Sequence, residues 1–537
     1  AAGDTVTING NDLAVAPAES PKTGYTWRKA DFAHLKGGLI QISVTENVAA
    51  VAMSISETFD PGVAMRDMSV FTQPESAHDH RVYATRHTDT VYTMPQYGSL
   101  AEWEAVAAKI RKRMLLACGL WPMPEKTPLN AQITGRIQHD DYSVERVCFE
   151  ARPGFYVTGN LYRPVGKGPF PAVICPHGHW DHGRLEDGQR GSFPARLITL
   201  ARMGMVGFNY DMIGYNDSLQ VTPHRAGSAL EKLWGISRFG MQLWQSIRVV
   251  DFLQSLPDVD SERIACTGAS GGATQTFALY SVDPRIKVAA PVNMISCSMQ
   301  GGCICENPPL LRFDVSNLEI GAMMAPRPIL MISATGDWTV ETPRIEYPAI
   351  RSIYRLYGAE DNVQTVQIDA EHNYNKASRE AMYPFMGKYL LNEPQKWSDF
   401  KEPPYTAESI EDLRVFPDDK LPDGALTEEQ LIANMIKASR EKWLAALPKT
   451  PEDVSAFHAE YGDALALVLG ASVPDINELK PERIGAPRPE GVDYIPDCVG
   501  LELRKKYAVE RWLIHRLGVG DSVPALLYRA HDATPQD

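Results

Sequence analysis

The chain lacks any apolar run that approaches the ~20 residues a helix needs to cross a membrane. It also lacks an excess of basic charge, since 53 Lys and Arg residues stand against 67 Asp and Glu residues and the formal net charge is −14. Phosphate binding needs clustered Lys and Arg, so this balance argues against a nucleic-acid partner. We therefore expect neither a membrane nor a nucleic acid among its partners, and the oligomeric state stays open.

Cysteine is scarce, with eight residues in a chain of 537. This number does not make a disulfide scaffold, and no two pairs have zinc-ribbon spacing. Three of the eight, Cys297, Cys303 and Cys305, lie close together in “ISCSMQGGCICEN”. They are interpreted as buried or loop thiols, with a bridge from Cys297 to Cys303 or Cys305 and a metal site as the alternatives.

The first residues show no Met, no basic n-region and no apolar h-region of a signal peptide. The start “AAGDT” is nevertheless typical of what remains after cleavage behind small residues. We therefore expect a secreted or periplasmic protein whose signal peptide has been removed.

The length predicts more than one structural unit, because single cores stop growing near about 250 to 300 residues. We expect an N-terminal extension of unclear fold over 1–95, a catalytic domain over 96–392, a connector rich in Pro and Asp over 393–425, and a helical C-terminal segment over 426–537. The last segment weakly echoes the helix at 99–121 and the strand at 156–171. It resembles the start of a second, incomplete module, with chance similarity as the alternative.

The middle of the chain alternates between apolar runs and helix-like segments. A helix over 99–121 and a hairpin over 146–164 come first. The apolar runs that follow are 171–178, 205–214, 263–269, 287–296, 327–337 and 363–373. Runs that are apolar on both faces and separated by helices specify an α/β fold, with a mostly parallel central sheet and helices on both faces.

A serine lies between glycines in “RIACTGASGGATQTF”, residues 263–277. Gly268, Ser270 and Gly272 fit the pattern G-x-S-x-G directly after a strand and before a helix. In such a turn side chains at the two glycines would collide with neighbouring backbone, while the serine hydroxyl is held at the helix N-terminus. Ser270 is therefore a candidate nucleophile.

A serine nucleophile needs a base and an acid that orients it. Asp337 lies just past one later strand, in “LMISATGDW”, and His372 lies just past the next, in “VQIDAEHNYN”. Both follow strand C-termini, the edge where open α/β sheets carry their sites. The sequence predicts Ser270, His372 and Asp337 as nucleophile, base and acid, with Glu306 as the competing acid; Asp361 and Asp369 are interpreted as surface or loop carboxylates.

The segment “PHGHWDHG” follows the first central strand, where an oxyanion-hole loop belongs. We expect the backbone N–H groups of Gly271 and His179 to form that hole, and Trp180, Trp338 and Glu306 to line the substrate pocket. The alternative is a metal site built from the side chains of His177, His179, Asp181 and His182. The oxyanion interpretation is preferred, so no metal and no other cofactor is expected.

Six motifs in register carry a family resemblance: “PHGHW”, “NYDMIGYNDS”, “GASGGATQT”, “GGCICENPPLLR”, “APRPILMISATGDWT” and “HNYNKASRE”. Together they resemble the acetyl xylan esterase-like branch of the α/β-hydrolases, related to bacterial carbohydrate esterases, over about residues 95–392. The resemblance implies an exported, cofactor-free serine esterase that acts on acylated plant or algal polysaccharides. It also implies Ser270, Asp337 and His372 as the triad.

The expected chemistry is hydrolysis of an ester through an acyl-enzyme, with acetyl as the favoured substituent and an acylated carbohydrate as the substrate. Members of the branch remove acetyl, methyl or aromatic acyl groups, so methyl and feruloyl esters stay open, as does a small-molecule carboxylesterase. A serine peptidase of the same fold and a non-catalytic binding protein are the remaining alternatives.

Overall fold

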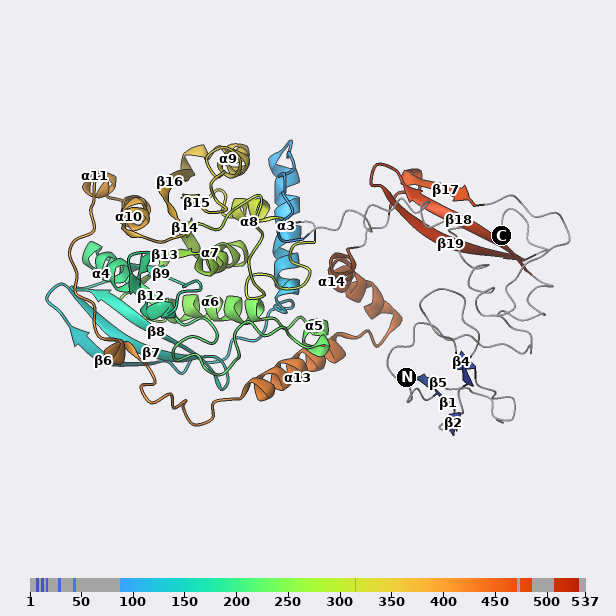
Figure 1. The fold of residues 1–537 in the computed structure, drawn as a ribbon, viewed down its shortest axis with the longest axis horizontal. Helices are drawn as coiled ribbons and strands as arrows, with labels where there is room; N and C mark the ends of the chain where they lie inside the picture. Colours follow the sequence, from blue (N-terminus) through green and yellow to red (C-terminus); the bar gives the residue numbers. More distant parts are fainter. Residues whose placement is uncertain are drawn as a thin grey trace. The chain divides into compact units, whose positions relative to one another are not determined.

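A computed structural model describes residues 87–313, 315–470, 474–484 and 507–530, together with the backbone of short strands before residue 45. The chain divides into two compact units, one of residues 86–471 and one that joins 1–85 to 472–537. The larger unit contains the α/β part (Figure 1). The expected connector 393–425 and the first helices of the expected C-terminal segment belong to this larger unit.

The larger unit is built on a nine-stranded sheet with the order β16-β15-β14-β13-β9-β12-β8-β7-β6. The strands from β16 to β12 in that order pair in parallel, and β8, β7 and β6 add to the β12 side as an antiparallel extension. The bounds are β6 Gln132–Gln138, β7 Tyr142–Arg152, β8 Phe155–Pro164, β9 Phe170–Ile174, β12 Val206–Tyr210, β13 Val259–Ala269, β14 Ile286–Val292, β15 Ile329–Gly336 and β16 Val363–Glu371. Parallel strands bring their carboxyl ends to one edge, which is where the site is expected.

Helices cover both faces of this sheet, as Figure 1 shows. One core packs under α3 (Leu100–Ala117), α6 (Arg238–Gln254), α7 (Gly271–Val282), α8 (Asn317–Ala322) and α9 (Glu346–Leu356). The other packs under α4 (Phe193–Met203) and α10 (Lys376–Leu390). The expected mixed α/β fold, with a mostly parallel sheet between helices, is therefore confirmed for this unit.

Shorter elements complete the larger unit. They are η2 (Gly183–Leu185), β10 (Asp187–Gly188), β11 (Gly191–Ser192), α5 (Ala229–Leu233), η3 (Glu360–Asn362), α11 (Pro394–Trp397) and α12 (Ile410–Leu413). Trp397 and Leu413, from the expected connector, are buried in the core under α4 and α10. The connector is therefore packed against the sheet domain.

The C-terminal segment is not helical throughout, which corrects the expectation for 426–537. Two helices, α13 (Glu428–Ala446) and α14 (Pro451–Leu469), are followed by η4 (Ile476–Glu478) and by a three-stranded antiparallel sheet. Its strands are β17 (Leu479–Arg483), β18 (Tyr507–Arg516) and β19 (Asp521–Ala530). The turn between β18 and β19 contains Gly518 and Gly520, both with positive φ, so the chain reverses there into a hairpin.

Most of the expected N-terminal extension, 1–95, lies outside the described residues. Its described strands are β1 (Val6–Ile8), β2 (Asn11–Leu13), β3 (Ala16–Pro17), β4 (Arg28–Lys29) and β5 (Ile42–Val44). Of these, β2, β1 and β5 form an antiparallel sheet, and β3 pairs with β4. The echo of the first module in the C-terminal segment stays a prediction.

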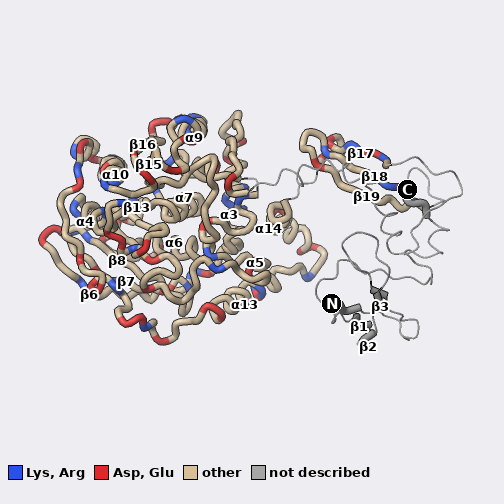
Figure 2. The backbone as a smooth tube through the Cα atoms, in the orientation of Figure 1, with Lys and Arg blue, Asp and Glu red and all other residues tan. Residues whose placement is uncertain are grey.

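Charge is intermixed over the larger unit. Figure 2 shows acidic and basic residues interleaved along the described backbone of 86–471, with neither sign confined to one end. Within the described ranges, every helix is too short or too polar to span a bilayer.

Helix α13 is fastened to the sheet domain through Glu428 in its first turn. The Glu428 carboxylate accepts hydrogen bonds from the Thr222 N–H at 2.8 Å and from Arg225 Nε at 2.9 Å, and it also pairs with Arg238. Burial opposes its ionisation, but the Thr222 and Arg225 bonds outweigh this and lower the pKa of Glu428 to about 2. The carboxylate thus favours the docked position of α13.

We expect Glu428→Gln to lower the free energy of unfolding at pH 7 by about 1 to 2 kcal/mol, a value that allows for solvent screening at this partly exposed group. The folded-state pKa lies below the ordinary value of 4.5. The stabilisation is therefore present in full above pH 4.5 and is lost as the pH falls towards 2. Urea unfolding at pH 7 and at lower pH measures this difference.

The matched control is Glu429→Gln, because Glu429 is the exposed carboxylate next to Glu428 in the same turn. It should change the free energy of unfolding by less than about 0.5 kcal/mol. Equal losses in the two variants, or a Glu428 effect that does not shrink below pH 4.5, would contradict the role of this ion pair.

Candidate active site

The three predicted catalytic residues lie at the carboxyl ends of three strands in the sheet. Ser270 directly follows β13, Asp337 directly follows β15, and His372 directly follows β16. These strands belong to the parallel part of the sheet, with β14 between β13 and β15. Their ends therefore face the same edge, and the side chains lie on neighbouring loops.

Ser270 occupies a sharp turn between β13 and α7. Its backbone has φ 57° and ψ −127°, a region that residues other than glycine rarely adopt. Although Ser270 is the N-cap of α7, its side chain makes no capping hydrogen bond, so the hydroxyl is not used by the helix. The strained turn thus places the Ser270 Oγ atom at the helix N-terminus, where it makes no capping hydrogen bond.

The glycines around Ser270 are needed for close packing, as the sequence predicted. A Cβ on Gly268 would lie 2.6 Å from both the Gly272 carbonyl and the Pro176 oxygen, and a Cβ on Gly272 would overlap the same Pro176 oxygen. Real Cβ atoms do not approach backbone this closely. The turn therefore packs directly against the loop that follows β9.

His372 is oriented by Asp337. The His372 Nδ1 and Asp337 Oδ2 atoms are 2.8 Å apart, and the Asp337 side chain is only 2% exposed. The other ring nitrogen, His372 Nε2, is buried and has no hydrogen-bond partner among the described residues. With Nδ1 donating its proton to the carboxylate, Nε2 keeps a lone pair that can accept a proton.

Asp337 is itself held in place by Thr339, a residue that sequence reasoning did not single out. The Thr339 N–H donates to Asp337 Oδ1 at 2.7 Å, and the Thr339 hydroxyl donates to the same oxygen at 2.5 Å. Both bonds leave Oδ2 for His372. A residue two positions after an Asp commonly makes such a backbone bond, so the “DWT” segment carried the signal.

Glu306, the competing acid, lies elsewhere in the site. Its buried carboxylate accepts from the Gly302 N–H at 2.7 Å and lies 3.4 Å from the Thr274 hydroxyl. A Cβ added to Gly271 would be 3.4 Å from Glu306 Oε1, so this carboxylate borders the nucleophile turn. The carboxylate that contacts His372 is that of Asp337, whereas Glu306 lines the wall beside Ser270.

The predicted oxyanion loop lies against the nucleophile turn. A Cβ on Gly178 would be 2.9 Å from Ser270 Cβ and 3.1 Å from the Gly271 nitrogen. A Cβ on Gly271 would be 3.6 Å from His179 Cε1. The backbone of Gly178 and His179 therefore runs beside the N-terminus of α7, where the helix dipole favours negative charge.

The two predicted pocket tryptophans have different surroundings. Trp338 packs on His372 with ring centroids 4.4 Å apart, and its indole nitrogen is buried without a partner among the described residues. Trp180 is half-buried, and its ring lies over Gly191. Trp338 therefore packs over the base, whereas Trp180 packs beside β11.

His177 does not belong to a metal site. Its Nδ1 lies 2.7 Å from the Gly178 carbonyl oxygen, and its Nε2 accepts from the Met212 N–H at 2.9 Å. Burial lowers the pKa of His177 to about 3, so the ring is neutral. Both ring nitrogens contact backbone groups, and the ring thereby holds the oxyanion loop in place.

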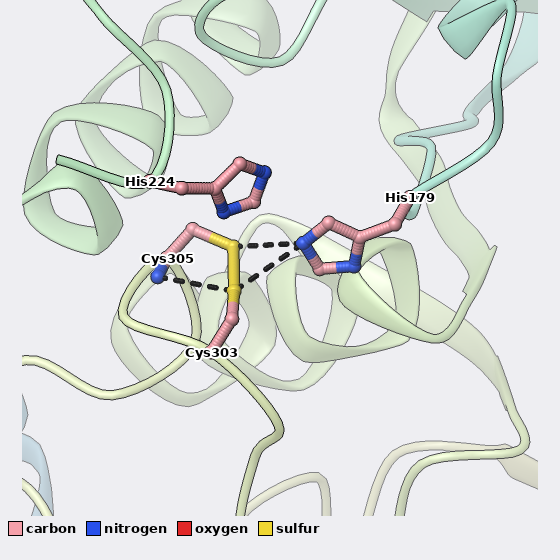
Figure 3. A group of neighbouring side chains, drawn as sticks. All are labelled: His179, His224, Cys303 and Cys305. Atoms are coloured by element: carbon pink, nitrogen blue, oxygen red, sulfur yellow. Dashed lines mark hydrogen bonds between the residues drawn. A yellow bond between two sulfur atoms is a disulfide. The ribbon is translucent and has the colours of Figure 1, made fainter.

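His179 instead lies in a cluster with His224, Cys303 and Cys305 (Figure 3). The structure pairs Cys303 with Cys305 in a disulfide and leaves Cys297 as a buried free thiol. The interpretation as a buried thiol is thus confirmed for Cys297 and wrong for Cys303 and Cys305, and the alternative bridge from Cys297 is not formed. The side chain of Cys297 is buried against the core under α7 and α8, whereas Cys303 and Cys305 share one loop and need no rearrangement to meet.

Sequence reasoning missed His224, because the motif “NYDMIGYNDS”, which enters the loop between β12 and α5, ends at residue 218 and does not include it. The fold brings that loop beside the oxyanion loop, and the two histidine rings lie 5.0 Å apart. A pocket next to Gly271 is lined in part by His179, His224, Cys305 and Tyr215. The cluster therefore forms part of the wall of the candidate active site.

Comparison with known proteins finds a curated relative and several solved structures that resemble this chain. No family model matches the chain. The curated relative is YtaP of Bacillus subtilis (strain 168), whose name describes it as a predicted hydrolase. It is 23% identical to this chain over 314 residues, and the match covers 53% of this chain and 99% of the relative.

Three solved structures resemble the chain. Methylesterase BT1017 is 29% identical with a TM-score of 0.53, and the match covers 65% of this chain and 78% of that one. An acetyl xylan esterase from Paenibacillus sp. R4 is 20% identical with a TM-score of 0.36, over 55% of this chain and 97% of that one. A glucuronoyl esterase from Solibacter usitatus is 14% identical with a TM-score of 0.41, over 57% and 98%. The expected resemblance to esterases is confirmed by the methylesterase.

Proposed function

We propose that this chain is an exported serine esterase that removes ester substituents, above all acetyl groups, from plant or algal polysaccharides. The observation that carries the proposal is the ring of His372, which donates through Nδ1 to Asp337 and presents an Nε2 that has no partner among the described residues. This is the state that a general base needs before it accepts a proton from a serine. The Cys303–Cys305 disulfide fits the exported location.

The reaction follows from the roles of these groups. His372 Nε2 takes the proton of the Ser270 hydroxyl as Oγ attacks the ester carbonyl carbon. The backbone N–H groups of Gly271 and His179 stabilise the oxyanion that forms on the carbonyl oxygen. The imidazolium, stabilised by ionised Asp337, then protonates the leaving alcohol. Water hydrolyses the acyl-enzyme by the reverse sequence, with His372 again as base.

Acetyl is the favoured substituent because the sequence motifs resemble the acetyl xylan esterase-like branch. Methyl esters are the second candidate, because the solved structure with the highest identity of the three above bears the name of a methylesterase. The two candidates share the triad chemistry and differ in which side of the ester carries the sugar. The two candidate activities are therefore distinguished by which ester is hydrolysed and not by the catalytic mechanism.

We expect acetylated xylo-oligosaccharide to be hydrolysed with at least ~10-fold higher kcat/KM than methyl-esterified oligogalacturonide or a feruloylated oligosaccharide, since pocket fit of small groups is worth about 1 to 3 kcal/mol. Release of acetate, methanol and ferulate from matched concentrations measures this ratio. A higher kcat/KM for the methyl ester would replace acetyl by the second candidate. Hydrolysis of all three esters no faster than by the Ser270→Ala variant would overturn the proposed function.

A further inference from the structure

The cluster of His179, His224, Cys303 and Cys305 has the composition of a transition-metal site. Figure 3 shows the side chains converging from three loops. The His179 loop follows β9, the His224 loop follows β12, and the loop with both cysteines follows β14. Two sulfur and two imidazole ligands are a donor set of structural zinc, whereas Ca²⁺ and Mg²⁺ prefer oxygen ligands.

The donor atoms lie close enough together to surround one ion after a local rearrangement. Zn–S bonds of about 2.3 Å and Zn–N bonds of about 2.0 to 2.1 Å place ligand atoms roughly 3.3 to 3.8 Å apart. His179 Nε2 lies 3.1 Å from Cys305 Sγ and 3.3 Å from Cys303 Sγ. One donor atom from each of the four residues lies within 4.8 Å of all the others. To bind an ion, the two sulfur atoms, which are bonded to each other, must move apart, and donor atoms farther apart than about 3.8 Å must move closer.

The backbone around the cluster holds His224 in an unusual conformation. His224 has φ 51°, in the left-handed region that few residues other than glycine adopt. The preceding Pro223 packs so closely over Gly214 that a Cβ there would overlap its ring. Backbone strain maintained by packing is common at functional sites. The His224 imidazole is thus presented to His179 by a packed loop.

The cluster is partly exposed to solvent and borders the pocket next to Gly271. His179 and His224 are exposed, Cys303 is half-buried and Cys305 is buried. An ion can therefore enter without opening the fold. His179, His224 and Cys305 also line the pocket next to Gly271, so a bound ion would lie in the wall of that pocket.

We propose that His179, His224, Cys303 and Cys305 form a Zn²⁺ site that is closed while the Cys303–Cys305 disulfide is intact and opens when it is reduced. A dithiol reductant supplies two electrons and two protons, which break the S–S bond and give two thiols, and the reductant becomes a disulfide. Zn²⁺ then binds both sulfurs as thiolates, and their two protons pass to solvent.

The test is zinc uptake by the full chain. This measurement needs no esterase activity, so its result does not depend on whether the proposed function is correct. Cys498, outside the described residues, is first replaced by Ser to remove a competing thiol. The protein is reduced with a phosphine, which becomes phosphine oxide with an oxygen from water, and is then mixed with Zn²⁺ and gel-filtered. The zinc content of the gel-filtered protein is then measured by elemental mass spectrometry. We expect about one Zn²⁺ per chain after reduction and none without reduction.

Variants assign the site. In chelator competition, His224→Ala should weaken Zn²⁺ binding at least ~10-fold, and Cys303→Ser should do the same. His182→Ala is the matched control, since His182 is an exposed histidine near His179 in the same segment but outside the cluster, and it should bind like the parent. Circular dichroism checks that each variant is folded, and His224→Ala alone carries the test if the cysteine variant is not. Reduced parent protein that binds no more zinc than His224→Ala would overturn the proposal.

Discussion

Ser270→Ala should lower kcat for acetate release by about 10⁶-fold, because loss of the nucleophile in a serine triad removes almost all of the rate that the triad provides. The substitution removes only Oγ from a residue whose side chain makes no capping bond. The backbone conformation is unchanged in kind, since alanine and serine tolerate φ 57° equally poorly. The loss should therefore appear in kcat and not in folding. Single-turnover and steady-state assays with acetylated xylo-oligosaccharide and with 4-nitrophenyl acetate measure it.

Ser398→Ala serves as the control, since Ser398 is an exposed serine of the same unit. It should keep kcat within about 2-fold, as surface substitutions usually do. Circular dichroism and thermal melting show that both variants are folded. Turnover of Ser270→Ala at the parent rate would exclude Ser270 as the nucleophile and with it the acyl-enzyme mechanism.

Asp337→Asn should lower kcat by about 10⁴-fold. The carboxylate accepts the Nδ1 proton of His372 at 2.8 Å, and an amide can instead offer its own N–H to that nitrogen. The ring would then carry its proton on Nε2, in the tautomer that cannot take a proton from Ser270. Because Thr339 bonds to the other carboxylate oxygen, it would hold the oxygen of the introduced amide in the same place, and the geometry should be kept. The pH dependence of kcat should change as well, with activity recovering partly at high pH.

Glu306→Gln separates the two acids. Glu306 borders Gly271 but makes its hydrogen bonds to Gly302 and Thr274, so its replacement should cost no more than about 100-fold, the effect of disturbing an oxyanion hole. Asp369→Asn is a further control, because the Asp369 carboxylate accepts a hydrogen bond from Thr335 on the neighbouring strand. This substitution should leave kcat unchanged. A larger loss for Glu306→Gln than for Asp337→Asn would reverse the assignment of the acid.

Much of the larger unit could be predicted because its signals are local. Strands β9, β12, β13, β14, β15 and β16 were all expected as strands of a mostly parallel sheet, and each pairs in parallel with a neighbour in the structure. Parallel pairing forces helices between the strands, which fixes the order of loops at the carboxyl edge. The edge strand β6 was missed, since its exposed side chains give no apolar run.

The C-terminal strands were missed for another reason. Residues 507–530 form a hairpin around a glycine-containing turn, but the segment was predicted from its likeness to an earlier part of the chain and not from its own residue pattern. Its helices α13 and α14 were expected as helical and are so. Periodicity is a physical signal of the local conformation, whereas likeness to another segment is indirect.

The sequence by itself determined the fold class and the edge of the sheet at which Ser270, Asp337 and His372 stand, because residue periodicity is a local property and parallel strands bring their carboxyl ends to one edge. Only the tertiary structure decided which carboxylate contacts His372, which cysteines pair, and that His224 joins His179. These contacts depend on the paths of loops and on side-chain packing between segments far apart in the chain. Such packing is decided when the whole core forms, and no short motif records it.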